Sequence, residues 1–297
     1  MIQVGWKNNP CTTSISSSRI NNSLVKYLGY IANENSLKQI CGGAFDSSNV
    51  ISIAIPSNVN KIDAYAFYNA NNLTTVAFHN KVSAIGDSAF GSCDSLQYIT
   101  IPSTVKTLGV NVFESCNNLL SVTINNNITK LPDYTFYKCP RLTEIVLPSS
   151  ISELGAYSLS ECDALIEFKI PESVKSIGDF AFYNNTNLIS VSIPNSVTSL
   201  GNSIFENCVK LASIVLPDSI VRVKNSTFKN CKSLLNVMLP KNLKEMGDNT
   251  FYNCIELISV KLPDTIISIG VNNFENCTSL KSVKMPKNSA TISVHNF

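Results

Sequence analysis

A period of 23 residues is the feature that most constrains how this chain can fold. Phenylalanine recurs every 23 residues, or after 46 where Leu159 takes its place. Cysteine and proline keep the same interval, and three residue types locked to one period exclude chance. A fixed period of roughly 20 to 50 residues indicates an array of stacked structural units. The phenylalanines of the series are Phe67, Phe90, Phe113, Phe136, Phe182, Phe205, Phe228, Phe251, Phe274 and Phe297.

The strand part of one repeat, hereafter a coil, can be read from residues 188–210, LISVSIPNSVTSLGNSIFENCVK. Val191 and Ile193 are expected to point inward from a short strand, because side chains alternate between the two faces of a strand. Pro194 ends that strand, since proline has no N–H to donate to the neighbouring strand. Val197 and Leu200 are expected to turn inward along a second side of the coil.

The remainder of the coil predicts a turn and a hydrophobic column. The position of Gly201 is glycine in seven of ten coils, which indicates either unusual backbone dihedrals or a close approach of two backbones. The following position, here Asn202, is Asp or Asn in six of ten coils and suits the N-cap of a short helical turn. Phe205 is expected to stack on its equivalents in neighbouring coils, and Cys208 to close the coil.

No coil can bury its apolar face alone, so the coils are expected to stack about 4.8 Å apart as a parallel ladder. We predict a leucine-rich-repeat solenoid: a right-handed curved rod with a parallel sheet on one wall and short helical or 3-10 turns on the other. A single repeat domain of residues 28–297 follows an N-terminal cap segment, 1–27. It comprises a degenerate coil at 28–49, ten coils at 50–279 and an incomplete coil at 280–297.

The pattern L-x-x-I-x-I-P-x-x-V-x-x-I-G-x-x-A-F-x-x-C-x-x resembles the BspA-like (Treponema-type) leucine-rich repeats. Residues 165–187 match it closely, with Ile170-Pro171, Ile177-Gly178-Asp179 and Ala181-Phe182, and the resemblance extends from about Leu28 to the end of the chain. It implies a surface antigen or adhesin that binds host or matrix proteins. Lys224 in place of the glycine and Asn185 in place of the cysteine are interpreted as scattered drift.

Composition narrows the class of partner. Lys plus Arg number 23 and Asp plus Glu 21, which leaves a net charge of +2 without a block of like charge. Nucleic acid is therefore not an expected partner. No run of about 18 apolar residues is present, so no membrane span is expected, and Met1 to Ile20 lack the pattern of a secretory signal. Localisation stays open: the resemblance favours the cell surface, whereas the missing signal and the thiols favour the cytoplasm.

The cysteine series allows three interpretations. Neutral thiols packed inside the coils are favoured, because free cysteine is commonly buried. Disulfides between neighbouring coils and a zinc site are the alternatives, and both fit poorly with parallel side chains and the absence of a C-x-x-C motif. Cys11 and Cys41 lie outside the series. They could form a disulfide with each other or could simply pack in the N-terminal cap. The cysteines of the series are Cys93, Cys116, Cys139, Cys162, Cys208, Cys231, Cys254 and Cys277.

Catalytic chemistry has few candidate residues. The two histidines, His79 and His295, are separated by about nine coils, so a nucleophile–histidine pair is not expected. His79 is expected to be an exposed turn residue. Glu144 and Glu167 occupy the same outward strand position in consecutive coils and are the best remaining acid–base candidates, although a solvated binding face is the favoured interpretation. We predict no enzyme activity and no cofactor.

The outward strand positions are predicted to form the binding ribbon, because each coil contributes two side chains to one face. Tyr98, Glu144, Glu167 and Lys169 form the predicted contact region, and Lys261 with Lys284 forms a second, basic one. The expected partner is a protein ligand, and the alternative to an adhesin is an intracellular scaffold for protein–protein contacts. Self-association through an open C-terminal coil is a further expectation, since terminal coils normally need a cap.

Overall fold

The computed structural model describes residues 38–297, apart from 126, 288–290, 294–295 and 297. These residues form two compact units, and each is described by itself. Among the described residues, unit 1 comprises 38–128 with Tyr134–Pro148, and unit 2 comprises Thr129–Asp133 with 149–296. The predicted cap segment, Cys11, His295 and Phe297 lie outside the described residues. The division of the chain into a cap and one repeat domain stays a prediction, as do the handedness and curvature of the rod.

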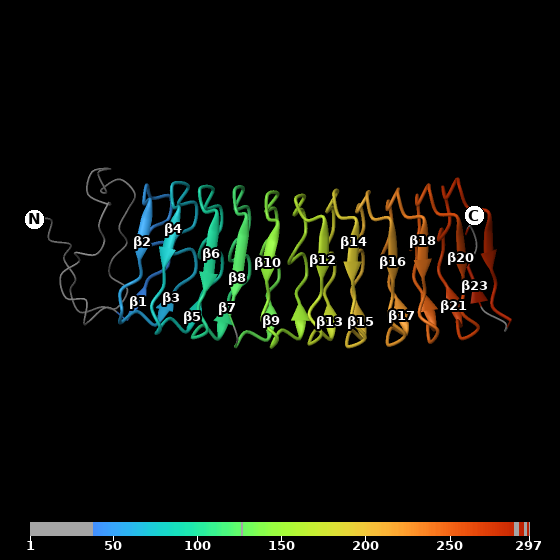
Figure 1. The fold of residues 1–297 in the computed structure, drawn as a ribbon, viewed down its shortest axis with the longest axis horizontal. Coiled ribbons are helices and arrows are strands. Elements are labelled where there is room, and N and C mark those ends of the chain that lie inside the picture. Colours follow the sequence, from blue (N-terminus) through green and yellow to red (C-terminus); the bar gives the residue numbers. More distant parts are fainter. Residues whose placement is uncertain (1–37, 126, 288–290, 294–295, 297) are drawn as a thin grey trace, which may run out of the picture. The chain divides into compact units, whose positions relative to one another are not determined.

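Unit 1 has two walls of strands, and most of its coils supply one strand to each wall (Figure 1). The inward and outward side chains alternate as predicted: in β2, Ser52 and Ala54 are exposed and Ile53 is buried. The first-wall strands are β2 (Ser52–Ala54), β4 (Thr75–Ala77), β6 (Tyr98–Ile101), β8 (Ser121–Ile124) and β10 (Glu144–Val146). The second-wall strands are β1 (Gln39–Ile40), β3 (Lys61–Ile62), β5 (Ala84–Ile85) and β7 (Thr107–Leu108).

Unit 2 repeats this arrangement with more coils. Its first-wall strands are β12 (Glu167–Lys169), β14 (Ser190–Ser192), β16 (Ser213–Val215), β18 (Asn236–Met238), β20 (Ser259–Lys261) and β22 (Ser282–Lys284). Its second-wall strands are β9 (Lys130–Leu131), β11 (Glu153–Leu154), β13 (Ser176–Ile177), β15 (Ser199–Leu200), β17 (Arg222–Val223), β19 (Glu245–Met246), β21 (Ser268–Ile269) and β23 (Thr291–Ile292).

All strand pairs among the described residues are parallel, and paired residues are 23 positions apart except between β1 and β3, where Gln39 pairs with Lys61, 22 positions away. In unit 1, Ile99 pairs with Val122, and in unit 2, Phe168 pairs with Val191. The parallel solenoid predicted from the 23-residue period is therefore confirmed within each unit. The sheet on the second wall was not predicted, because two-residue strands leave too short an alternation to be recognised in a sequence.

The remaining part of the coil, here called the turn side, carries the phenylalanine and the cysteine. The described residues contain no helix, so the predicted helical or 3-10 turns are not confirmed. Alternate amides on this side hydrogen-bond to the next coil rather than along the chain: Phe205 N donates to Thr227 O at 3.0 Å, and Asn207 N to Lys229 O at 2.9 Å. Left-handed backbone at Ser203 and Asn207, with φ of 53° and 65°, also interrupts any right-handed helical path.

The Asp or Asn position has a different role from the predicted N-cap. Asp179 Oδ1 accepts a hydrogen bond from Asn202 N at 2.7 Å, one coil further on, and Asn225 Oδ1 accepts one from Asp248 N at 3.0 Å. Without a helix there are no helix amides to cap, so the side chain pairs instead with the stacked coil. This side-chain ladder joins successive coils beside the second wall.

The glycine that precedes this position is required by the close approach of two backbones and not by unusual dihedral angles. Gly201 does not appear among the positive-φ residues, and a Cβ at Gly201 would come well inside 3.0 Å of the Asp179 backbone nitrogen. The same clash with the preceding coil arises at each glycine of the column. A side chain in place of any of these glycines would therefore require a local shift of the two backbones.

The core of each unit is a column of stacked phenylalanine rings. In unit 1 the rings of Phe90 and Phe113 stack with centroids 5.8 Å apart. In unit 2 the rings of Phe182 and Phe205 stack at 5.5 Å, and Leu159 is fully buried in the same position of its coil. The predicted phenylalanine column is confirmed within each unit by Phe45, Phe67, Phe90, Phe113 and Phe136, and by Phe182, Phe205, Phe228, Phe251 and Phe274.

Candidate binding surfaces

The outer face of the first wall in unit 1 brings Tyr98 and Glu144 into one row. Tyr98 pairs with Ser121 in β8, and Ser121 pairs with Glu144 in β10, so the two predicted contact residues are two strands apart. The Ser121 hydroxyl donates to Glu144 Oε2 at 3.0 Å. Tyr98 is 62% exposed, which leaves an aromatic ring available for contact.

The outer face of the first wall in unit 2 carries the other predicted residues. Glu167 and Lys169 are exposed at the two outward positions of β12. Lys261 and Lys284 pair directly across β20 and β22, so the predicted basic region is brought together. The contact region of Tyr98, Glu144, Glu167 and Lys169 takes two residues from each unit and stays a prediction, as does the acid–base pairing of Glu144 with Glu167.

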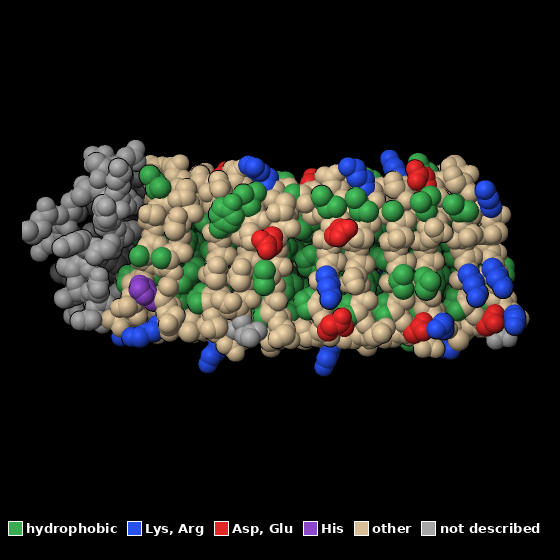
Figure 2. All heavy atoms as spheres, in the orientation of Figure 1, with side chains coloured by type: hydrophobic (Ala, Val, Ile, Leu, Met, Phe, Trp, Pro, Cys, Tyr) green, Lys and Arg blue, Asp and Glu red, His purple; other side chains and the backbone are tan. Residues whose placement is uncertain are grey.

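Unit 2 also exposes a stripe of apolar side chains that sequence reasoning missed. The stripe occupies the position just before each first-wall strand from β12 to β20, and successive backbones are joined there: Ile189 N donates to Ile166 O at 2.7 Å, and Leu235 N to Ala212 O at 2.9 Å. Figure 2 shows hydrophobic side chains in a row across this face. The apolar stripe comprises Ile166, Ile189, Ala212, Leu235 and Ile258.

The exposure of these side chains separates the stripe from the core. Ile166 is 55% exposed and Ile258 is 39% exposed, whereas Leu165 and Leu257 beside them in the chain are buried. A contiguous exposed apolar strip of this kind marks an interaction surface more often than isolated apolar residues do. The signal was present in the sequence, because the position is apolar in five consecutive coils of unit 2, whereas the equivalent residues of unit 1 mix polar and apolar side chains: Ile51, Thr74, Gln97, Leu120 and Thr143.

The cysteines form columns of buried thiols, as favoured by the sequence. All nine cysteines that the structure describes are buried thiols. Seven thiols of the column donate to the phenylalanine carbonyl of the preceding coil: Cys208 Sγ donates to Phe182 O at 3.2 Å, and Cys116 Sγ to Phe90 O at 3.1 Å. The Cys162 thiol instead lies 3.8 Å from Ser160 O. Burial raises the pKa of both Cys116 and Cys208 to about 12, and a backbone hydrogen bond offsets only part of that shift.

Asn185 shows that one departure from the repeat is a structural replacement rather than drift. It is fully buried in the cysteine position, and its Nδ2 donates to Leu159 O at 2.9 Å, as the thiols do to their phenylalanine carbonyls. Its Oδ1 also accepts a bond from Cys162 N at 2.7 Å. A buried carboxamide is tolerated because both of its ends are hydrogen-bonded.

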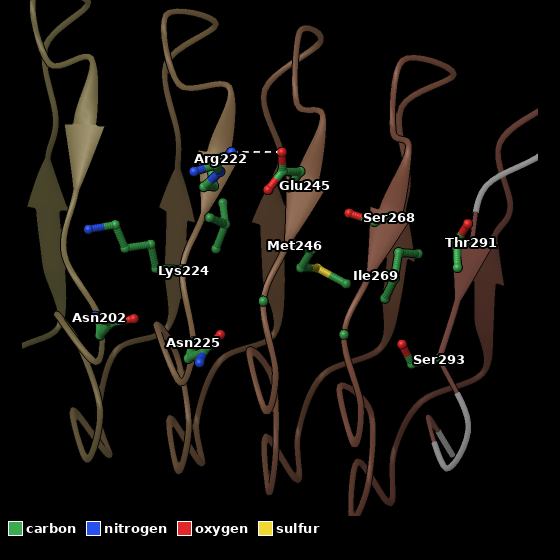
Figure 3. Close-up of a pocket in the computed structure, with 13 residues that line it drawn as sticks. Asn202, Arg222, Lys224, Asn225, Glu245, Met246, Ser268, Ile269, Thr291 and Ser293 are labelled. Atoms are coloured by element: carbon green, nitrogen blue, oxygen red, sulfur yellow. Dashed lines mark hydrogen bonds and ion pairs between the residues drawn. The ribbon is translucent and has the colours of Figure 1, made fainter.

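A hollow of about 290 Å³ lies on the second wall of unit 2 and was also missed. Figure 3 shows Arg222, Lys224 and Glu245 at one end and Ser268, Thr291 and Ser293 towards the other. Arg222 and Glu245 form an ion pair at 2.7 Å. The signal in the sequence was Lys224, where most coils have glycine. The further residues that line the hollow are Asn202, Val223, Asn225, Met246, Gly247, Ile269 and Gly270.

Other candidate chemistries find little support among the described residues. His79 is exposed, as predicted. No group of three or more His, Cys, Asp or Glu side chains in the described part of the chain is arranged to hold a metal ion. Within the same residues, nothing forms a helix with the length and apolar character needed to cross a bilayer. The surfaces above are therefore the candidates for function.

Comparison with known proteins identifies the repeat. The model of the BspA type Leucine rich repeat region matches in 6 copies, over residues 11–120, 108–234 and 199–297. The chain belongs to the BspA-type leucine-rich-repeat family. BspA-type repeats form scaffolds that generally bind proteins. Among curated proteins, none matches this chain.

Solved structures of bacterial leucine-rich repeat proteins share the fold of this BspA-type chain. A protein from Bacteroides ovatus is 28% identical, with a TM-score of 0.61 over 86% of this chain and 78% of that one. One from Eubacterium ventriosum is 24% identical, with a TM-score of 0.59 over 86% and 78%. The pneumococcal vaccine antigen PcpA is 19% identical, with a TM-score of 0.56 over 83% and 67%. The last two bear on the fold alone.

Proposed function

We propose that this chain is a protein-binding module of the adhesin or surface-antigen type, which engages a host or matrix protein through the outer face of its first wall. The observation that carries the proposal is the apolar stripe of unit 2. It lies directly beside the outward rows of β12 to β22, so one face offers apolar side chains flanked by polar and charged ones. Protein interfaces combine a desolvated apolar centre with a polar rim in the same way.

The outward rows beside the stripe supply the features expected of that rim. Ser190, Ser213 and Ser259 leave the sheet surface accessible, while Val215 and Met238 extend the apolar area, with Met238 63% exposed. Lys261 and Lys284 add positive charge at one end of the same face. A partner that presents apolar side chains next to carboxylates would match this distribution. No reacting group is required, and we propose no catalytic role.

Binding to a panel of immobilised plasma and extracellular-matrix proteins tests the proposal. Leu235→Asp places a charge in the centre of the apolar stripe and should weaken the binding of any captured protein by at least about tenfold. Ser199→Asp, an equal change of charge at an exposed position of the second wall, is the matched control and should leave affinity within about twofold. An equal loss in both variants, or a panel without any binder, would overturn the proposal.

A second candidate is an intracellular scaffold for protein–protein contacts, and the free thiols favour it. Nine buried cysteines without a disulfide are typical of proteins that work in a reducing compartment. Labelling of intact cells with a reagent that does not cross membranes distinguishes the two. Labelled chain supports the surface module, whereas protection in intact cells together with binding to a cytosolic extract supports the scaffold.

A further inference from the structure

Lys224, like Asp63 and Pro132, places a side chain at a position that is glycine in seven of ten coils. The seven glycines of this column would each bring a Cβ well inside 3.0 Å of the preceding coil. In the structure, the hydrogen bonds that normally join successive coils on both walls are interrupted next to this lysine. β15 and β17 belong to different sheets, and so do β14 and β16. The coils on either side of Lys224 are thus less tightly joined on the strand walls than other neighbours in unit 2.

The interruption leaves backbone donors without partners. Gly201 N donates to Ile177 O at 2.8 Å, and Gly247 N to Val223 O at 2.9 Å, but within the described residues no such bond joins Lys224 N to Leu200 O. The ladder of Asp and Asn side chains is interrupted at the same place, since no described acceptor pairs with Asn225 N. Two consecutive backbone N–H groups, those of Lys224 and Asn225, therefore have no hydrogen-bond acceptor among the described residues.

The charges around the hollow leave one cation without a partner. Arg222 pairs with Glu245 at 2.7 Å, whereas the Lys224 ammonium has no ion-pair partner among the described residues. Figure 3 shows the Lys224 side chain extending towards the coil of Asn202, at the end of the hollow away from Thr291. An ammonium and two consecutive backbone N–H groups supplied by one short segment are groups that can bind an anion together.

The rest of the hollow favours a peptide over a small free anion. From Lys224 to Thr291 the hollow crosses three coil steps, about 14 Å at about 4.8 Å each, which is the length of about four residues of extended chain. Met246 and Ile269 form an apolar floor, and the hydroxyls of Ser268, Thr291 and Ser293 lie along it. Glu245 adds a negative charge within the hollow, which disfavours a second acidic residue in the ligand.

We propose that this hollow binds an extended acidic peptide segment of a protein partner, with one carboxylate held by Lys224 and the amides of Lys224 and Asn225. The following uncharged residues of the peptide lie over Met246 and Ile269. This site is separate from the apolar stripe, so the chain has a binding surface on each wall of unit 2. The unfavourable lysine is then explained by recognition, because glycine at this position would close the wall and remove the charge.

Fluorescence anisotropy with the full chain tests the site. The probes are labelled octapeptides that contain one central Glu among uncharged residues, each paired with the same peptide carrying Gln. The Glu peptides should bind at least about tenfold more tightly than the Gln peptides, and more weakly as salt is raised. Because this comparison needs no variant protein, it does not depend on how a substitution affects folding.

Variants then locate the charge that is responsible. Lys224→Gln should remove the preference for Glu, Lys224→Arg should retain most of it, and Lys244→Gln, an exposed lysine one coil further on and outside the hollow, should leave it unchanged. Leu235→Asp on the first wall should also leave it unchanged, so failure here and failure of the first-wall proposal are distinguishable. Equal binding of Glu and Gln peptides would overturn the proposal. Binding of N-acetylglutamate or inorganic phosphate as tight as that of the peptides would overturn the peptide assignment.

Discussion

The turn side and the strand walls of unit 2 differ most in how they join the coil of residues 188–210 to the next coil, residues 211–233. On the turn side the junction is like any other: Phe205 N donates to Thr227 O at 3.0 Å, and the rings of Phe205 and Phe228 stack at 5.8 Å. On both strand walls the sheets are interrupted there. The turn side, with the bonds from Ala212 N to Ile189 O and from Ser219 Oγ to Val197 O, holds the two coils together without strand pairing, which leaves the strand walls free to vary. We therefore expect the turn side to contribute most of the stability and the strand walls to bind partners.

The largest effect is expected from the phenylalanine column. Phe182→Ala should lower the free energy of unfolding by about 3–5 kcal/mol, because it leaves a cavity in a fully buried stack. Ser190→Ala, on the outer face of the first wall, should change it by less than about 0.5 kcal/mol. Denaturant unfolding of the two variants measures the difference. Comparable losses would show that the walls contribute as much to stability as the turn side.

The buried thiols predict a loss of stability in alkaline solution. The pKa of Cys208 is raised from 9.0 to about 12 in the folded chain, so the unfolded chain releases this proton first as pH rises. The contribution is fully present below pH 9.0 and is lost between that value and about 12, at about 1.4 kcal/mol per pH unit for each such thiol. Cys208→Ala should flatten this part of the pH profile. A profile unchanged by that substitution would contradict the prediction.

Asn185 offers a smaller and more specific test of the turn side. Asn185→Ala removes both hydrogen bonds and leaves Leu159 O and Cys162 N buried without those partners, at a cost of about 1–3 kcal/mol. Asn185→Cys restores the donor to Leu159 O that the other coils use and should recover part of the loss. Thermal unfolding of the two variants provides the measurement. If Asn185→Cys is no more stable than Asn185→Ala, the two side chains are not equivalent.

Much of the architecture was predictable because the 23-residue period specifies which residues stack on each other in neighbouring coils. Once residues 23 apart are stacked, the burial of Phe205, Cys208 and Val191 follows from alternation and hydrophobicity, and the structure confirms all three. Hydrogen-bond partners were harder to predict. An N-cap is a local device that a sequence suggests directly, whereas the bond from Asn202 N to Asp179 Oδ1 exists only after the coils have stacked. The apolar residues of the stripe can be read from the sequence, but only the structure shows that their side chains are exposed.

The sequence by itself determined the 23-residue register, the inward set of side chains and the family of the repeat, because all three depend on spacing along the chain. The tertiary structure decided the absence of helix in the described coils, the carbonyl partner of each thiol and the interruption of the strand walls at Lys224. These features depend on small differences in the spacing between neighbouring coils. The amino-acid sequence does not specify such differences directly. A lysine that appeared to be drift thus lies where both strand walls are interrupted, in a column where a Cβ at each glycine would meet the backbone of the preceding coil.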